Sequence, residues 1–278
     1  MSLNLHIMIE IKNLRFKYGK NKLLFDNFSI NMESGRIIGL LGKNGAGKST
    51  LLKLIAGLLF PQQGKLLVNS YLPKDRNPNF LADIYMISEE FALPNVSIAS
   101  YVKAMSPLYP AFGHDKLAAI LSEFELQSND KLHHLSHGQR KKFLIAFALA
   151  SNCKLLILDE PTNGLDIPSK SQFRKILVNS VNEGQLVIIS THQVKDIDTI
   201  IDTVVTIDNG HLVFQETTEA ISQKYLFETV SKVEDISGLL HQEKAFSGYR
   251  IIRENNSEEE TAIDLELLFD AIINNKIK

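Results

Sequence analysis

The chain has 278 residues, a length that suggests roughly two domains, or one large domain with an appendage. Hydrophobic residues make up 44% of it and charged residues 22%, which excludes a disordered, collagenous or disulfide-stapled protein. The formal net charge is −2, so the composition does not favour nucleic acid or an anionic membrane surface as a partner.

The expected cellular setting follows from the single cysteine and from the lengths of the apolar runs. Cys153 cannot form an internal disulfide, and we interpret it as a core thiol in a reducing compartment. The longest apolar run, residues 143–150, is far shorter than the ~18 residues that a membrane-spanning helix needs. Residues 1–8 do not have the pattern of a secretory signal. We therefore expect a cytoplasmic protein without direct membrane insertion.

Strand patterns are clearest near the N-terminus. Residues 7–18 and 22–32 alternate apolar and polar side chains, which is the period of half-buried strands, and we expect them to form an antiparallel edge layer. Residues 36–41 form a short apolar run of the kind buried in a parallel sheet. A glycine-rich segment follows, and the apolar residues of 51–59 then recur at helical spacing.

The middle of the chain alternates predicted helices with predicted strands. Residues 96–126 have helical periodicity that Pro107 and Pro110 interrupt, which indicates an inserted helical lobe. Beyond the lobe we expect helices at 136–150 and 168–182 and buried strands at 154–158 and 185–190. This alternation predicts a parallel sheet with helical crossovers.

A hairpin and a change in pattern mark the end of this α/β region. Asp208-Asn209-Gly210 separates two apolar segments, 204–207 and 211–214, and predicts a hairpin turn. After about residue 223 the pattern is that of a small strand and helix appendage. There we expect strands at 225–230 and 249–254, a solvated acidic loop at 254–260 and an amphipathic helix at 264–274.

A phosphate-binding loop is the most specific chemical signal in the sequence. It matches G-x-x-x-x-G-K-S between a predicted strand and a predicted helix, and it comprises Gly42, Lys43, Asn44, Gly45, Ala46, Gly47, Lys48, Ser49 and Thr50. The glycines let successive backbone N–H groups point at phosphate oxygens, and the helix N-terminus adds its positive dipole end. We expect Lys48 to neutralise the β- and γ-phosphates, Ser49 to bind Mg²⁺ and Thr50 to reach the α-phosphate.

Two adjacent carboxylates supply the expected partner of this loop. Asp159 ends the buried strand at 154–158, and ligands of open α/β sheets bind at the carboxyl ends of the strands. We expect Asp159 to hold Mg²⁺ and Glu160 to accept a proton from an attacking water.

A resemblance to a known family enters with the residues that open the helix at 136–150. Leu135, Ser136, His137, Gly138 and Gln139 resemble LSGGQ, the signature motif of ATP-binding cassette (ABC) ATPases. The remaining motifs of that family follow in the same order over residues 7–219: Tyr18, the phosphate loop, the helical lobe, the signature, the acidic strand, Gly164-Leu165-Asp166 and Ser190-Thr191-His192.

The resemblance implies an α/β fold of the P-loop NTPase type, in the form found in ABC ATPases. Such a fold has a parallel-sheet core, an antiparallel β subdomain and an inserted helical subdomain, here at about residues 90–140. The ATPase domain is then expected over residues 1–222. Residues 223–278 are expected to form a small α+β accessory region at the C-terminus.

The resemblance also implies a mechanism. ATP would bind between two head-to-tail cassettes, in a homodimer or in a pair of different chains, with the phosphate loop of one facing the signature of the other. It assigns Tyr18 to stacking on adenine, Asp166 to signalling across the dimer, and His192 to contacting the γ-phosphate and orienting Glu160. Lys48, Glu160 and His192 are the expected catalytic residues.

Two residues depart from the family pattern. Glu89 stands where the family usually has a glutamine, unless Glu90 is the equivalent residue. A carboxylate can still join Ser49 and Asp159 on Mg²⁺, but it adds negative charge and donates no hydrogen bond unless protonated. Either the family tolerates this change, or it weakens or gates hydrolysis. His137 replaces the first glycine of the signature and adds a side chain beside the phosphate, with the same two interpretations.

The favoured function is the ATPase subunit of an ABC transporter that works through separate integral membrane permease subunits, with export preferred over import. Such a subunit would lie peripherally on the inner face of the cell membrane. A soluble ABC ATPase that acts on ribosomes or DNA is the first alternative, but the chain has no tandem cassette, basic linker or long coiled-coil insertion. A degenerate ATP-sensing module is the second, suggested by Glu89 and His137.

Overall fold

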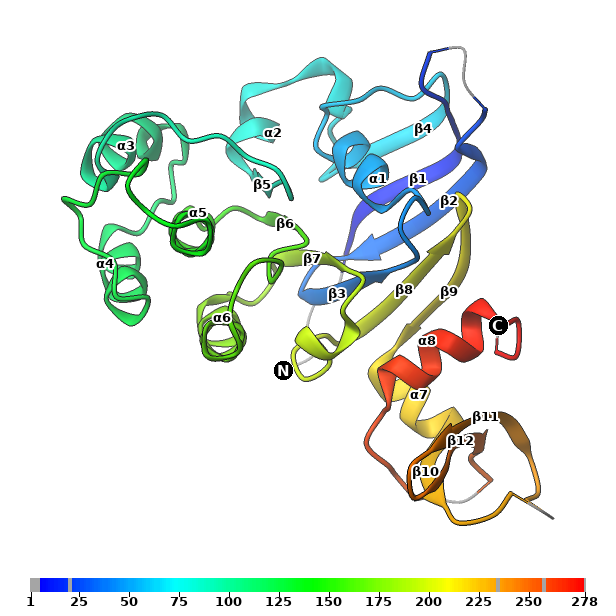
Figure 1. Cartoon of the computed structure of the whole chain (residues 1–278). Coiled ribbons are helices and arrows are strands. Elements are labelled where there is room, and N and C mark those ends of the chain that lie inside the picture. The colour runs from blue at the N-terminus through cyan, green and yellow to red at the C-terminus, as the bar shows by residue number, and fades with distance from the viewer. Residues whose placement is uncertain (1–5, 20–21, 234–235, 257–258, 278) are drawn as a thin grey trace.

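A six-stranded sheet forms the centre of the computed structural model, which describes residues 6–19, 22–233, 236–256 and 259–277 (Figure 1). Five neighbouring strands are parallel and the last is antiparallel. In spatial order they are β5 (Ile84–Ile87), β6 (Leu155–Asp159), β7 (Leu186–Thr191), β3 (Arg36–Leu41), β8 (Thr203–Asp208) and β9 (His211–Thr217). The predicted parallel sheet and the predicted hairpin are both confirmed.

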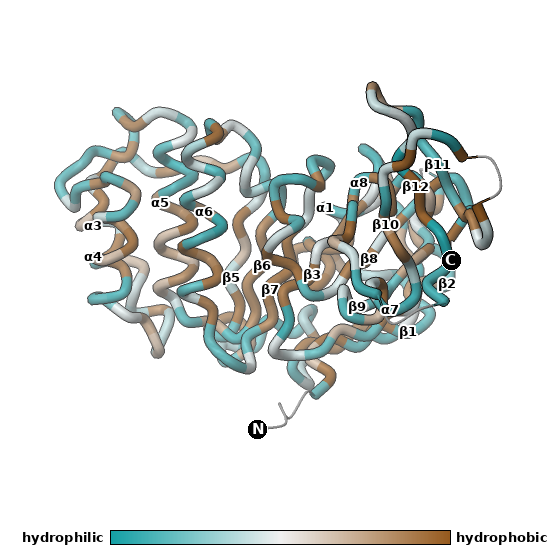
Figure 2. The backbone as a smooth tube through the Cα atoms, turned by 90° about the horizontal axis from the view of Figure 1, so that it is seen from below, coloured by the Kyte–Doolittle hydropathy of each residue, from teal (hydrophilic) through white to brown (hydrophobic). Residues whose placement is uncertain are grey.

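The parallel strands are apolar because both of their faces are covered. Every residue of β6 and β7 is buried, and Figure 2 shows β5, β6, β7 and β3 largely in the colour of hydrophobic residues. The polar residues of β6 and β7 lie near their carboxyl ends, at Asp159 and at Ser190-Thr191. In these two strands the polar side chains are therefore confined to the carboxyl ends.

A second, antiparallel sheet carries the expected edge layer. It consists of β2 (Phe25–Glu33), β1 (Ile7–Phe16) and β4 (Gln63–Val68), in that spatial order. The sequence analysis did not identify β4. Helix α1 (Lys48–Ile55) is also shorter than the apolar spacing predicted, because Gly57 takes a left-handed conformation (φ 68°) that ends the helix.

The helical lobe lies on the opposite side of the central sheet from this antiparallel sheet (Figure 1). Its prolines separate α3 (Ile98–Met105) from α4 (His114–Glu123), as predicted. The short elements near it are η1 (Pro73–Asp75), α2 (Pro78–Ala82) and η2 (Ser106–Leu108).

Two longer helices connect the lobe to the sheet. Helix α5 (His137–Ala150) is packed beneath an aromatic cluster, in which the rings of Tyr101, Tyr109 and Phe112 lie 4.9 to 6.0 Å from that of Phe147. Helix α6 (Ile167–Ser180) begins after the capping residue Asp166 and ends two residues before the predicted Asn182.

The C-terminal residues form a third sheet and a last helix. The chain enters them through α7 (Thr218–Lys224), whereas the short helix η3 (Val194–Asp196) lies earlier, between β7 and β8. The sheet has the order β10 (Tyr225–Val230), β12 (Gly248–Glu254), β11 (Leu239–Ala245), and α8 (Leu265–Ile273) follows. The sequence analysis missed β11 because its mostly polar side chains do not alternate.

Helix α8 packs against β8, β9 and η3, and its buried side chains belong to the same apolar core as the lobe and α6. The C-terminal residues thus share a core with the rest of the chain. Residues 1–5, which belong to the segment without a secretory signal pattern, and residues 257–258 of the predicted acidic loop lie outside the described residues.

Two expectations about the cellular setting can be compared with the fold. Within the described residues, no helix is long and apolar enough to cross a bilayer. Cys153 is 2% exposed, and burial raises the pKa of its thiol to about 12, so it is a core thiol as predicted.

The turn of the β8–β9 hairpin supports the phosphate loop. The N–H group of Gly210 donates to the carbonyl oxygen of Ala46 at 3.0 Å. Gly210 has a left-handed backbone (φ 78°), and a Cβ atom there would lie 1.7 Å from the carbonyl oxygen of Leu24. Only glycine fits between the two segments.

We predict that Gly210→Ala destabilises the protein more than Gly184→Ala does. Gly184 is also left-handed (φ 85°), but a Cβ atom there would meet no atom within 4 Å, so its change costs only the backbone strain of about 1–2 kcal/mol. Gly210→Ala adds a steric clash of about 1–3 kcal/mol. Urea unfolding measures both values, and equal losses would contradict the packing argument.

Candidate nucleotide-binding site

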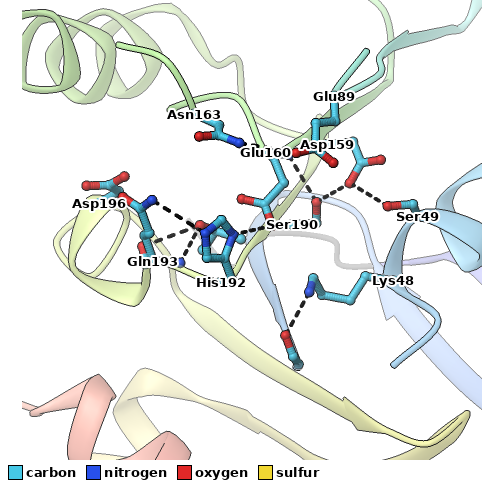
Figure 3. Close-up of polar contacts among 12 residues, drawn as sticks. Lys48, Ser49, Glu89, Asp159, Glu160, Asn163, Ser190, His192, Gln193 and Asp196 are labelled. Carbon is cyan, nitrogen blue, oxygen red and sulfur yellow. Dashed lines mark hydrogen bonds and ion pairs between the residues drawn. The ribbon is translucent and has the colours of Figure 1, made fainter. Parts of the chain in front are cut away.

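A cavity of about 860 Å³ lies where the parallel strands end. The phosphate loop forms one wall of this cavity, and Glu89, Glu160 and His192 face it from other elements. Figure 3 shows these side chains grouped around one space. The remaining lining residues are Tyr18, Lys22, Leu23, Leu24, Asn163 and Asn209.

The phosphate loop curls because two of its glycines take left-handed conformations, with φ of 81° at Gly45 and 112° at Gly47. Helix α1 then begins at Lys48, whose Nζ donates to the carbonyl oxygen of Gly42 at 2.7 Å. Burial lowers the pKa of the Lys48 ammonium, while the charges of Glu160, Asp159 and Glu89 oppose that change. The loop thus holds a cation at the N-terminal end of a helix, which is an environment for phosphate.

Asp159 lies deep in the site, with two hydroxyl groups on one of its oxygens. Ser49 Oγ donates to Asp159 Oδ1 at 3.2 Å, and Ser190 Oγ donates to the same oxygen at 2.5 Å. Ser49 thus reaches across from the phosphate loop to the end of β6. This all-oxygen pair fits Mg²⁺, a hard cation that is held by few protein ligands together with phosphate oxygens.

Glu160 and His192 form a second pair. His192 Nδ1 lies 2.9 Å from Glu160 Oε1, although the two residues follow different strands. Glu160 has a left-handed backbone (φ 49°), which is uncommon for a non-glycine residue and needs support from its surroundings. Its N–H group donates both to the carbonyl oxygen and to Oγ of Ser190, at 3.1 Å each.

The segment after His192 is held from two sides. Lys170 Nζ of α6 donates to Gln193 Oε1 at 2.9 Å and forms an ion pair with Asp196 at 2.8 Å. From the other side, Glu266 of α8 forms an ion pair of 2.8 Å with Lys195. The C-terminal helix therefore contacts the segment that carries His192.

Glu89, and not Glu90, is the acidic residue that lines the cavity. Asn163 Nδ2 donates to Glu89 Oε1 at 3.1 Å, which links the loop after β5 to the loop after β6. Of the two candidates, Glu89 is therefore the one whose carboxylate lies at the cavity.

Tyr18 lines the cavity beside Thr50, the last residue of the phosphate loop. Its hydroxyl group lies 3.1 Å from Thr50 Oγ1, and its ring packs edge-on against Phe16 with the centroids 5.0 Å apart. The ring is 44% exposed and so offers an accessible surface beside the cavity.

The predicted signature residues do not line this chain's own cavity. Ser136 caps α5 by accepting from the Gln139 N–H group at 3.2 Å, and Gln139 Oε1 accepts from the Ser136 N–H group at 2.9 Å. The His137 ring stacks on Phe91, with the centroids 5.2 Å apart. The start of α5 therefore faces solvent and not this chain's own phosphate loop.

Asp166 also lies outside the cavity. Its side chain accepts from the Ser169 N–H group at 2.9 Å and so caps α6. This hydrogen bonding lowers the pKa of the Asp166 carboxyl group. The structure thus gives Asp166 a local structural role.

Comparisons with known proteins identify the family. The family model described as "ABC transporter" matches residues 25–163. The chain is 31% identical to the lantibiotic transport ATP-binding protein SrtF of Streptococcus pyogenes over 212 residues, which cover 75% of this chain and 90% of SrtF. It is 36% identical to the methionine import ATP-binding protein MetN of Clostridioides difficile (strain 630), over 77% of this chain and 70% of MetN.

The chain belongs to the ABC transporter family. The solved structure of an ATP-binding subunit of an ABC transporter has the same fold, with a TM-score of 0.71 and 25% identity over 77% of this chain and 91% of that one. The expected P-loop NTPase fold of the ABC type is therefore confirmed, and the chain is an ATPase of this family.

Sequence reasoning did not assign roles to three residues of this ABC cassette: Ser190, Asn163 and Lys141. Ser190 contacts both acidic residues, Asn163 contacts Glu89, and Lys141 donates to the backbone carbonyl oxygen of Glu160. A polar residue near the end of a buried strand was the available signal for Ser190. Lys141 was visible only as a charge within an otherwise apolar helix.

We predict that Ser190→Ala lowers both stability and turnover. Loss of the hydroxyl removes a partner of Asp159 and one of Glu160, which costs about 1–3 kcal/mol of unfolding free energy and roughly tenfold or more in kcat. Ser151→Ala is the matched control, since Ser151 is equally buried but donates to Ala148 away from the cavity. Unfolding and ATPase assays decide, and unchanged turnover in Ser190→Ala would contradict the role.

Proposed function

We propose that this chain is the ATP-binding and ATP-hydrolysing subunit of an ABC transporter, and that it drives transport through separate membrane subunits. One observation carries the proposal: the phosphate loop, Glu160 and His192 line one cavity, Asp159 contacts Ser49 of that loop, and the signature lies outside the cavity. This is half of a site that a second cassette would complete.

In the proposed mechanism, residues around the cavity bind the phosphates, the adenine base and Mg²⁺. Lys48 neutralises the β- and γ-phosphates, and Tyr18 stacks on adenine. Ser49 and Asp159 would hold Mg²⁺, with Glu89 as a third oxygen donor at the cavity, and the ion would supply charge neutralisation for the phosphates.

Hydrolysis requires a water molecule with a base beside it. Glu160 accepts the proton of that water, and His192 orients Glu160 through the 2.9 Å contact and meets the γ-phosphate. The left-handed backbone of Glu160 directs its side chain into the cavity at a defined angle.

We propose that two cassettes, identical or different, associate head to tail. The capped and solvent-exposed N-terminus of α5 would then offer Ser136 and backbone N–H groups to the γ-phosphate on the opposing chain. Asp166 caps the start of the neighbouring helix α6. From there it would signal the state of one site to the opposing cassette. ATP binding closes the pair and hydrolysis reopens it.

An apolar groove supports the proposed membrane partner. It has a volume of about 680 Å³ and runs between α2 and η2, that is, between the ATPase core and the helical lobe. Leu108 is 58% exposed at its rim, with Leu58 on the core side. A cytoplasmic helix of a permease subunit would cover these side chains and hold the chain on the inner face of the membrane.

We also propose that residues 1–222 are the ATPase domain, with its helical subdomain at about 90–140, and that residues 223–278 are an accessory region. The ion pair between Glu266 and Lys195 supports a role for this region close to the segment of His192. We propose export as the direction of transport, because the motif arrangement resembles that of export cassettes. A methionine import protein is also among the relatives, so the direction of transport needs a test. The test is the direction of ATP-driven flux in inverted membrane vesicles.

We predict that Glu160→Gln lowers kcat by about 10²–10⁴-fold and leaves ATP binding intact, because the amide cannot accept the proton of the attacking water. Glu183→Gln is the control, since Glu183 is an exposed carboxylate outside the cavity. Steady-state ATPase assays and equilibrium binding of ATP measure the two effects. Equal turnover in Glu160→Gln and wild type would favour the ATP-sensing alternative.

For the groove, we predict that Leu108→Glu prevents co-purification with the proposed membrane subunits, because it places a charge in an apolar interface. Val178→Glu is the matched control, as Val178 is 51% exposed on α6. Both variants should keep the melting temperature of wild type, since both side chains face solvent. Retained co-purification of Leu108→Glu would overturn the docking assignment.

A further inference from the structure

Lys141 is a buried lysine that the ATPase mechanism does not account for. It lies on the second turn of α5, five residues after the signature serine Ser136, and its side chain is only 1% exposed. A buried ammonium group must find partners, because leaving water unpaired is costly. Lys141 Nζ donates to the carbonyl oxygens of Glu160 and Asn163, at 2.9 and 3.0 Å.

These two acceptors lie on the loop that aims the proposed catalytic base. Ser190 accepts the hydrogen bonds of the Glu160 N–H group, while Lys141 donates to the Glu160 carbonyl group. The peptide groups on both sides of Glu160 are therefore fixed, which is what a left-handed glutamate needs to persist. Lys141 supplies one of these restraints, together with the Asn163 N–H group, which donates to the same carbonyl oxygen at 3.2 Å.

Asn163 carries the connection further, to Glu89. Its carbonyl oxygen accepts from Lys141, and its side-chain amide donates to Glu89 Oε1 at 3.1 Å. Glu89 and Lys141 thus hold the same residue from opposite sides of the loop. Burial lowers the pKa of the Lys141 ammonium, and the carboxylate of Glu89 is the strongest of the charges that oppose this change, ahead of Glu160 and Asp159.

We propose that Lys141 and Glu89 form a charge-compensated pair, joined through Asn163, that positions Glu160. In this arrangement the buried Lys141 ammonium offsets the negative charge that Glu89 introduces in place of the family's usual glutamine. Lys141 is then a positioning residue whose effect on hydrolysis passes through Glu160, and Glu89 positions Glu160 through Asn163 in addition to offering an oxygen to Mg²⁺. The inference rests on the proposed catalytic role of Glu160.

The test compares Lys141→Gln, Glu89→Gln and the double variant with wild type. Lys141→Gln leaves Glu89 without its counter-charge and should lower kcat about tenfold, with KM for ATP nearly unchanged. The double variant removes both charges and should turn over within about threefold of Glu89→Gln alone. If the two effects simply multiply in the double variant, the pair does not exist.

Lys116→Gln is the control for losing a lysine that donates to a backbone carbonyl outside the site, although Lys116 is less buried than Lys141. Lys116 of α4 donates to the carbonyl oxygen of Ser180 and to Asn152 Oδ1, and neither residue lines the cavity. It should lower the melting temperature without changing kcat. A Glu160→Gln variant measured alongside keeps the two proposals apart, since normal turnover in Glu160→Gln refutes the catalytic role, whereas strict multiplicativity refutes only the pair.

Asn163 offers a second route should Lys141→Gln not fold. Asn163→Asp places a carboxylate against Glu89 and should lower kcat at least about threefold more in the wild-type background than in the Glu89→Gln background. Equal losses in the two backgrounds would overturn the proposal, because the link through Asn163 would then carry no charge effect.

Discussion

β3, β7 and β6 pair in parallel with Leu41 beside Thr191 and Ser190 beside Asp159, and this register determines where each proposed catalytic group lies. The carboxyl ends of parallel strands reach the same edge of a sheet. Ser49 and Asp159 therefore meet although they are 110 residues apart in the chain. A shift of one residue would turn alternate side chains to the opposite face and separate these groups.

That edge concentrates charge. Three carboxylates, those of Asp159, Glu160 and Glu89, lie near two ammonium groups, those of Lys48 and Lys141. Like charges at such proximity raise the free energy of the folded state unless cations or hydrogen bonds offset them. The Lys48 ammonium approaches these carboxylates from the phosphate loop, where a bound nucleotide would add negative charge. The Lys141 ammonium approaches them from α5, where it is buried and donates to the backbone of the loop after β6.

Helix α5 contributes both to the signature and to the support of Glu160. Its capped N-terminus faces outward, while Lys141, on its second turn, reaches inward to the carbonyl of Glu160. The segment after His192 is held comparably, between α6 and the C-terminal helix α8. Because packed elements transmit small displacements, events at the signature or at the C-terminal region have short physical routes to the proposed catalytic pair.

Local pattern alone determined the phosphate loop, the acidic strand end and the order of the cassette motifs, since each depends on neighbours in the chain. It also located most helices and strands, but it overextended α1, where Gly57 ends the helix, and it missed β11, whose side chains do not alternate. Only the tertiary structure decided that Glu89 and not Glu90 faces the cavity, that Ser190 joins the two acids and that Lys141 lies beneath Glu160. These facts depend on strand register and helix packing, which bring together residues whose separation in sequence carries no signal of contact.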